Sequence, residues 1–232
     1  MSLELLNISF THPGSAALLE HLNLQVAPGE LVGLSAPSGA GKSTLLRIAA
    51  LMLGADSGTV CINGITVAAG QEIPTAVRRN LGVVLQSPRA AADPRLRLDS
   101  LICAPLDFQL RALRPRPHKH AERISQLADF VELSPKILRN YPHQVSDGQL
   151  QRALIARSLI LDPSVLICDE PTAALDAQTT RMILQVLSRQ AASGTAVLIA
   201  SHDAAALTPV AHRMQQLADL GAPRIKAVEQ SS

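Results

Sequence analysis

The stretch APSGAGKST, at residues 36–44, decides the fold that this sequence predicts. It matches the phosphate-binding pattern G-x-x-x-x-G-K-[ST] at every defined position except the first. In such a loop Gly39 and Gly41 let backbone N–H groups approach an anion, and Lys42 brings a positive charge to the terminal phosphates. The Ser43 hydroxyl can reach Mg²⁺. An apolar run precedes the loop and a helical pattern follows it, which is the context that the motif requires.

Ala36 stands where the pattern has a glycine. A non-glycine residue is strained wherever the loop requires a positive φ. Alanine adds only a methyl group, however, and it leaves every phosphate-facing residue in place. We therefore predict a working nucleotide site, with contacts from the loop residues Ser38, Gly39, Ala40, Gly41, Lys42, Ser43 and Thr44.

The composition indicates a globular protein. The chain has 232 residues, 47% hydrophobic and 17% charged, so it can bury a full core and disorder is not expected. The net charge of +2 is too small to make nucleic acid the expected partner. No apolar run reaches the roughly 18 residues needed to span a bilayer, and the N-terminus lacks a signal-peptide pattern. Three cysteines without a pairing pattern fit a reducing cytosol.

Two strand patterns predict an α/β fold. Residues 22–26 alternate apolar and polar, and residues 59–67 read as two strands about an Asn63-Gly64 turn, so an antiparallel portion is expected near the N-terminus. Continuous apolar runs typical of buried parallel strands lie at residues 31–34, 81–85, 165–168 and 196–200. Helical patterns that separate most of them lie at residues 43–53, 149–161 and 178–192. This alternation favours an α/β core with a mostly parallel sheet, and the phosphate-binding loop makes it a P-loop NTPase core.

The segment between the second and third apolar runs has a different character. Repeated prolines break it into short helices, so we interpret residues 87–160 as an inserted helical subdomain. Residues 1–86 and 161–232 then form the nucleotide-binding core of a single domain. A basic stretch at residues 111–123 is interpreted as a solvated face.

A second site element is VLICDEPT, at residues 165–172. A buried apolar strand has no structural reason to end in two carboxylates. A nucleotide site gives each of them a role, since Asp169 can hold Mg²⁺ and Glu170 can orient and polarise the attacking water. A turn at the end of a strand is the alternative, because Asp and Pro also favour turns.

Four more motifs follow in a fixed order. Gln86 ends an apolar strand, and residues 141–152, YPHQVSDGQLQR, are similar to the signature L-S-G-G-Q followed by Q-R. Residues 173–176 read AALD, and residues 201–203 read SHD after a strand. With the loop and the carboxylates, this order resembles the ATPase subunit of an ABC transporter over almost the whole chain.

The resemblance implies roles for particular residues. Glu170, Gln86 and His202 would take part in catalysis. Ser43, Gln86 and Asp169 would hold Mg²⁺. Beyond the loop, ATP would be contacted by His12, Ser146, Gly148, Gln149 and Asp176.

Two further positions depart from the family pattern. His12 falls where the family places an aromatic ring against adenine, with Phe10 as a substitute. Asp147 replaces the first glycine of the signature, which in this family closes on the nucleotide of a second subunit. A carboxylate about 4 Å from a γ-phosphate is repelled by roughly 4 kcal/mol at an effective dielectric near 20, unless it turns away or a cation intervenes.

The resemblance predicts an ATP-hydrolysing subunit at the cytoplasmic face of the cell membrane. The segments QSPR and DPR, at residues 86–89 and 93–95, and YPHQ before the signature are similar to importers of peptides, nickel or metal chelates. Its partners would be two transmembrane permease subunits, an extracytoplasmic substrate-binding protein and a second ATPase subunit, with a heterodimer favoured. The alternatives are a catalytically weakened subunit paired with an active one, an export-type ATPase, and an ABC-type ATPase acting on nucleic acid or ribosomes.

Overall fold

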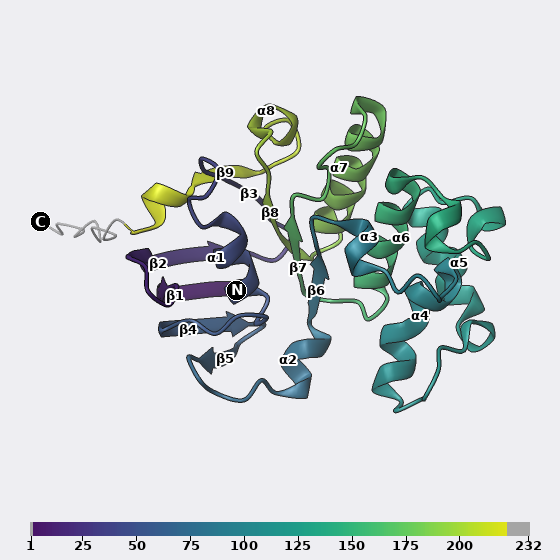
Figure 1. The fold of residues 1–232 in the computed structure, drawn as a ribbon, viewed down its shortest axis with the longest axis horizontal. Helices are drawn as coiled ribbons and strands as arrows, with labels where there is room; N and C mark the ends of the chain where they lie inside the picture. The colour runs from purple at the N-terminus through teal and green to yellow at the C-terminus, as the bar shows by residue number, and fades with distance from the viewer. Residues whose placement is uncertain (1, 222–232) are drawn as a thin grey trace, which may run out of the picture.

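The computed structural model describes residues 2–221 and shows an α/β fold with two sheets (Figure 1). The strands of the first sheet are β1 (Leu3–Thr11), β2 (Ala17–Val26), β4 (Ser57–Ile62) and β5 (Ile65–Ala68). They lie in the order β2-β1-β4-β5, and all three pairings are antiparallel. Asn63 and Gly64 form the turn between β4 and β5 with φ of 50° and 82°, which confirms the predicted hairpin.

The second sheet is parallel throughout. Its strands are β3 (Leu31–Ser35), β6 (Leu81–Val84), β7 (Val165–Asp169), β8 (Ala196–Ala200) and β9 (Arg213–Gln216). They lie in the order β6-β7-β8-β3-β9. The four continuous apolar runs of the sequence form the first four strands in this order, as predicted, and β9 is an additional edge strand.

Helices cover both faces of the parallel sheet, and 3-10 turns join some of them. The α-helices are α1 (Lys42–Ala49), α2 (Thr75–Arg79), α3 (Pro88–Ala91), α4 (Leu98–Gln109), α5 (Ala121–Phe130), α6 (Asp147–Leu159), α7 (Ala177–Ala192) and α8 (Ala204–Leu207). The 3-10 turns are η1 (Pro117–Lys119), η2 (Pro135–Ile137), η3 (Pro142–Gln144) and η4 (Leu217–Gly221). Helix α1 is shorter than the sequence pattern predicts, and Leu51, just beyond it, has a positive φ of 55°.

Each central strand of the parallel sheet contributes to two hydrophobic cores. In β7, Val165 and Ile167 pack with α1 and the antiparallel sheet, whereas Leu166 and Cys168 pack with α4, α6 and α7. Successive side chains of a strand point to opposite faces, so a strand buried on both faces is apolar at every position. This is the physical origin of the continuous apolar runs.

Helices α3 to α6 lie between β6 and β7 in the chain and form a cluster beside the parallel sheet, opposite the antiparallel one (Figure 1). Their buried side chains, such as Leu101, Ile124 and Leu150, join the core under α7. Among residues 2–221, no helix combines the length and the apolar character needed to cross a membrane.

Candidate nucleotide site

The register of the parallel sheet brings the two main site elements to one edge. Leu34 of β3 and Asp169 of β7 both pair with Ala200 of β8, so these strands end at the same level. The phosphate-binding loop leaves the end of β3, and Glu170 follows the end of β7. Segments that are more than 120 residues apart in the chain, as Ser43 and Asp169 are, therefore meet there.

The loop runs directly into α1. Gly41 is the N-cap of this helix with a φ of 101°, and a side chain there would come within 2.9 Å of Leu19. The Lys42 side chain is buried and folds back along the loop, donating from Nζ to the carbonyl oxygens of Ala36 at 2.7 Å and Pro37 at 3.2 Å. Its ammonium group is thus held inside the curve of the loop, where an anion would be bound.

Ala36 lies outside the positive-φ region, which in the loop is occupied by Gly39 and Gly41. The methyl group therefore causes no backbone strain of the kind that the sequence left open. The glycines are the residues that require conformational freedom, and both are present. The departure from the pattern at Ala36 leaves the loop geometry intact.

Ser43 and Asp169 form the second part of the site. The Ser43 hydroxyl donates to Asp169 Oδ1 at 3.1 Å, and Asp169 is buried. Burial raises the pKa of the Asp169 carboxyl, the neighbouring Glu170 charge raises it further, and the hydrogen bond from Ser43 opposes both. The charges of Arg47 and Lys42 also oppose the rise, but the pKa stays above its ordinary value. The carboxylate and hydroxyl oxygens are hard donors of the kind that suits Mg²⁺. The residues present therefore fit the predicted metal.

Glu170 is held between two polar side chains. Gln86 donates from Nε2 to Glu170 Oε2 at 3.1 Å, and His202 Nδ1 lies 3.1 Å from the same oxygen. Glu170 has a positive φ of 47°, unusual for a non-glycine residue, and its backbone N–H donates to the carbonyl oxygen of Ala200. The structure thus brings together three residues, Gln86, Glu170 and His202, for which the sequence predicted catalytic roles.

The signature residues lie at the start of α6. Ser146 caps this helix by accepting from the backbone N–H of Gln149 at 3.2 Å, and Gln149 Oε1 accepts from the Ser146 N–H at 3.0 Å. A side chain at Gly148 would come within 2.5 Å of Thr179 on α7, so helix packing also requires a glycine there. None of the hydrogen bonds that Ser146 and Gln149 make within residues 2–221 reaches the phosphate loop.

Asp176 is fully engaged in its own helix. It caps α7 by accepting from the N–H groups of Gln178 at 3.0 Å and Thr179 at 2.9 Å, and from the Thr179 hydroxyl at 2.6 Å. The hydrogen bonds from Thr179 lower the pKa of the Asp176 carboxyl, which therefore remains ionised. Through Thr179, this motif also contacts Gly148 of the signature.

Asp147 has a cationic partner that sequence reasoning missed. Arg89 on α3 donates from Nε to Asp147 Oδ1 at 2.6 Å, so the carboxylate is paired within its own chain. The sequence raised an intervening cation only in general terms. The segment QSPR contains Arg89 but was interpreted only as an importer feature, because the pairing of Arg89 with Asp147 depends on how α3 packs beside the start of α6.

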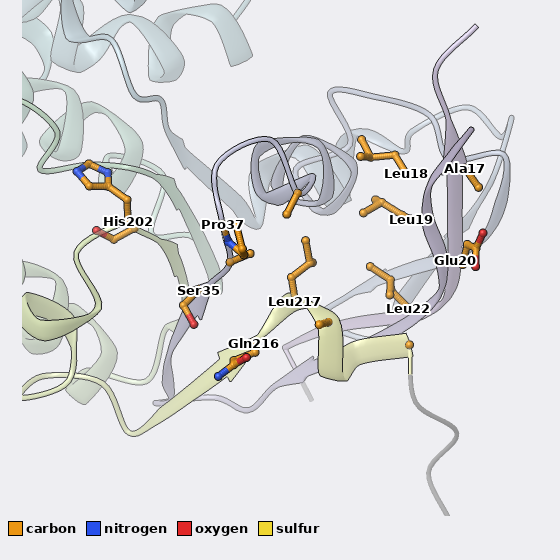
Figure 2. A pocket seen from close by; sticks show the side chains of 15 residues that line it. Ala17, Leu18, Leu19, Glu20, Leu22, Ser35, Pro37, His202, Gln216 and Leu217 are labelled. Carbon is orange, nitrogen blue, oxygen red and sulfur yellow. The ribbon is translucent and has the colours of Figure 1, made fainter. Parts of the chain in front are cut away.

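His12 directly follows the last residue of β1. It is exposed, and its ring stands edge-on to Phe10 with 4.9 Å between the ring centres. Phe10 itself is buried. Neither ring lines the cavity of about 750 Å³ beside the phosphate loop, between β2 and the segment after β9. Figure 2 shows its wall, where Leu18, Leu19 and Leu217 face the loop at Pro37. Besides these leucines, the lining includes Ala36, Pro37 and Ala40 of the loop and His202, so the cavity adjoins the phosphate site, although Lys42, Ser43 and Asp169 are not among its lining residues.

The family model for the ABC transporter matches residues 19–173, which is more than half of the chain. The chain belongs to the ABC transporter family. The methionine import ATP-binding protein of Shouchella clausii is 40% identical over 182 residues, covering 77% of this chain and 50% of that protein. The oligopeptide transport ATP-binding protein of Escherichia coli is 31% identical over 206 residues, covering 87% of this chain and 60% of that protein. The chain thus spans about half to three fifths of these curated relatives.

A solved relative confirms the fold of this ABC family member. The ATP-binding cassette MJ0796, determined as a dimer in a post-hydrolysis state with ADP and Pi, superposes with a TM-score of 0.79 at 28% identity. The match covers 92% of this chain and 93% of that one. The predicted parallel sheet with a separate antiparallel portion is therefore that of an ABC ATPase.

Proposed function

We propose that this chain binds ATP at the loop of residues 36–44 and hydrolyses it with Glu170 as the residue that orients the attacking water. The observation that carries the proposal is the convergence of Lys42, Ser43 and Asp169 at the sheet edge where Glu170 also lies. Fixed positive groups and loop N–H groups hold the phosphates, and a carboxylate beside them can accept a proton from water.

The residues around Asp169 and Glu170 have different proposed roles. Ser43 and Asp169 would hold Mg²⁺, which when bound neutralises phosphate charge, and Gln86 can add an amide oxygen to the ligand set. Gln86 and His202 both contact the same Glu170 oxygen, so they set the direction of its carboxylate. The backbone of Glu170, which has a positive φ, is hydrogen-bonded to Ala200 of β8, and this contact helps to hold the carboxylate in that direction.

The chain would act as the motor of an importer. The two curated relatives are named for the import of methionine and the transport of oligopeptides, so a peptide or another small nutrient is the proposed cargo. Permease subunits would carry the pore, an extracytoplasmic binding protein would deliver cargo, and the chain would lie at the cytoplasmic face of the membrane. Nickel remains a prediction from the short loops near Gln86.

Two ATPase subunits would complete each other's sites. Within residues 2–221, the hydrogen bonds of Ser146 and Gln149 do not reach their own phosphate loop, and the cassette MJ0796 was solved as a dimer. Ser146 can still donate its hydroxyl proton to a partner's nucleotide while it accepts from Gln149. The prediction of a heterodimer rested on the resemblance to peptide and nickel importers and on the repulsion expected between Asp147 and a partner's phosphate. The pairing of Asp147 with Arg89 weakens the second reason, and the choice stays a prediction.

Glu170→Gln tests the hydrolytic role. The variant should bind MgATP but lose turnover by about 100-fold or more, because the amide cannot accept the proton of water. Lys42→Ala should instead weaken ATP binding. Steady-state hydrolysis and equilibrium nucleotide binding, measured on the complex that the full-length chain forms in its host, separate the two effects.

Glu132→Gln is the matched control. Glu132 also has a positive φ, 58°, and its carboxylate also has a side-chain partner, Arg189 at 2.9 Å, but on the surface beside α7. The Glu132→Gln variant should hydrolyse ATP at the parent rate. Parent turnover in Glu170→Gln would contradict the proposed role and would favour a weakened subunit whose partner performs hydrolysis.

A further inference from the structure

Asp147 occupies a sensitive position at the start of α6. It is the first residue of the helix, and its side chain is 57% exposed. A helix N-terminus carries a partial positive charge that attracts anions, and a carboxylate in the first turn competes for that attraction. An unpaired Asp147 would therefore stabilise α6 but repel a phosphate brought to the same place.

Arg89 makes three contacts around this position. Its Nε donates to Asp147 Oδ1 at 2.6 Å, one terminal nitrogen donates to the carbonyl oxygen of Val145 at 2.8 Å, and the other donates to the carbonyl oxygen of Pro142. The guanidinium group thus spans the whole turn that leads into α6. Its planar array of donors suits several acceptors at fixed angles, which a lysine cannot match.

The same arginine lies three residues after Gln86, on α3. Gln86 contacts Glu170, and Arg89 contacts the start of α6. The short segment between them therefore links the catalytic carboxylate to the signature through hydrogen bonds and only a few residues of backbone.

We propose that Arg89 is a positioning residue that neutralises Asp147 and fixes the turn before α6, so that the signature can accept a partner's phosphate. This inference rests on the proposed function, because it assumes that the signature completes a site on a second ATPase subunit. The carboxylate of Asp147 is kept on its own chain, and the N-terminus of α6 with the Ser146 hydroxyl remains available to an anion.

The test compares four versions of the full-length chain in its host complex: parent, Arg89→Ala, Asp147→Asn and the double variant. Arg89→Ala should lower MgATP turnover by about tenfold, because it leaves a bare carboxylate near the partner's phosphate. The double variant should recover most of that loss, although it too lacks the contacts with Pro142 and Val145. Asp147→Asn alone should stay within about twofold of parent.

Ionic strength gives a second readout that a purely structural role would not affect. Added salt screens exposed like charges, so the defect of Arg89→Ala should shrink as salt rises relative to parent. Arg95→Ala is the control, since Arg95 also pairs with an aspartate, Asp93 at 2.9 Å, without touching the signature. It should match parent at every salt concentration.

Two outcomes would overturn the inference. Parent turnover in Arg89→Ala would show that the charge of Asp147 is harmless, and equal losses in Arg89→Ala and the double variant would assign Arg89 to the two carbonyls alone. If Arg89→Ala fails to fold, Arg89→Lys and Arg89→Gln are compared instead. Lysine keeps the positive charge and glutamine does not, so only this proposal predicts that Arg89→Lys retains more turnover than Arg89→Gln. Loss of the Glu170→Gln effect would instead count against the proposed function itself.

Discussion

Asp169 and Asp107 are both buried aspartates, yet their surroundings shift their pKa values in opposite directions. Asp169 ends β7 at the nucleotide site, where one hydroxyl hydrogen-bonds to it and Glu170 adds a like charge. Asp107 lies in α4 of the helical cluster, where several donors surround it.

The environment of Asp107 is saturated. Burial raises its pKa, but hydrogen bonds from the Arg116 backbone at 2.6 Å and from the Arg116 side chain at 3.1 Å, with His120 Nε2 at 3.3 Å, lower the pKa to about 2. The thiol of Cys103 adds a weaker contact at 3.7 Å. Asp107 thus has a structural role, because its partners tie α4 to the loop before α5.

Asp169 has a single hydroxyl donor, and burial with the Glu170 charge keeps its pKa above the ordinary value although the charges of Arg47 and Lys42 oppose that rise. The comparison teaches that burial alone does not mark a functional carboxylate. A deficit of donors around a buried charge does, because that deficit is what a metal ion can remove.

Asp169→Asn should have the largest effect. Turnover should fall by about 100-fold, because the amide removes the charged ligand of Mg²⁺. The free energy of unfolding should stay equal or rise, because burial disfavours the charge in the folded state. Steady-state ATP hydrolysis and urea unfolding measure the two quantities, and a clear loss of stability in Asp169→Asn would break the comparison.

Asp107→Ala should show the reverse pattern. It leaves the Arg116 N–H and His120 without their acceptor, so we expect a loss of about 2 kcal/mol in the free energy of unfolding. Turnover per folded molecule should match parent, because Asp107 belongs to α4, which lies in the helical cluster well away from α1 (Figure 1). Asp93→Ala removes the exposed pair with Arg95 and serves as the control, with an unchanged urea midpoint.

The sequence predicted most of the parallel sheet because buried strands carry a strong apolar signal. It missed β1, where Leu3 and Leu5 are followed by Ile8 and Phe10. Asn7, with a φ of 55°, lies at a register shift that breaks the two-residue period. It also missed β9, a short edge strand whose residues are largely polar.

The site divides in the same way. Motif spacing led to Lys42, Ser43, Asp169 and Glu170, because phosphate and metal chemistry dictate those residue types in order. No such chemistry relates Arg89 to Asp147, since their contact depends on packing between segments 58 residues apart. The expected contact of His12 with adenine rested on alignment to a family position, and that residue role stays a prediction.

The pH dependence of Mg²⁺ binding is the smallest expected effect and the one that most directly sharpens the contrast between the two carboxyls. A raised pKa means that the folded protein binds the Asp169 proton more tightly than the unfolded chain does, and Mg²⁺ must displace that proton. The tightening of ATP binding by Mg²⁺ should therefore weaken as pH falls, beginning above the ordinary aspartate value of about 3.9. Asp107 has a lowered pKa, so its contribution to stability is present above that ordinary value and is lost only as pH falls toward about 2.

ATP itself also binds protons, so the measurement is the difference in Mg²⁺ effect between parent and Asp169→Asn, taken by calorimetry across one pH series. We expect that difference to be several-fold at neutral pH and to vanish as the pH is lowered. It should vanish at a pH at which the urea midpoint still shows the full Asp107 contribution. Parallel curves for parent and Asp169→Asn would mean that Asp169 does not titrate with the metal, and the donor deficit around it would then have no functional consequence.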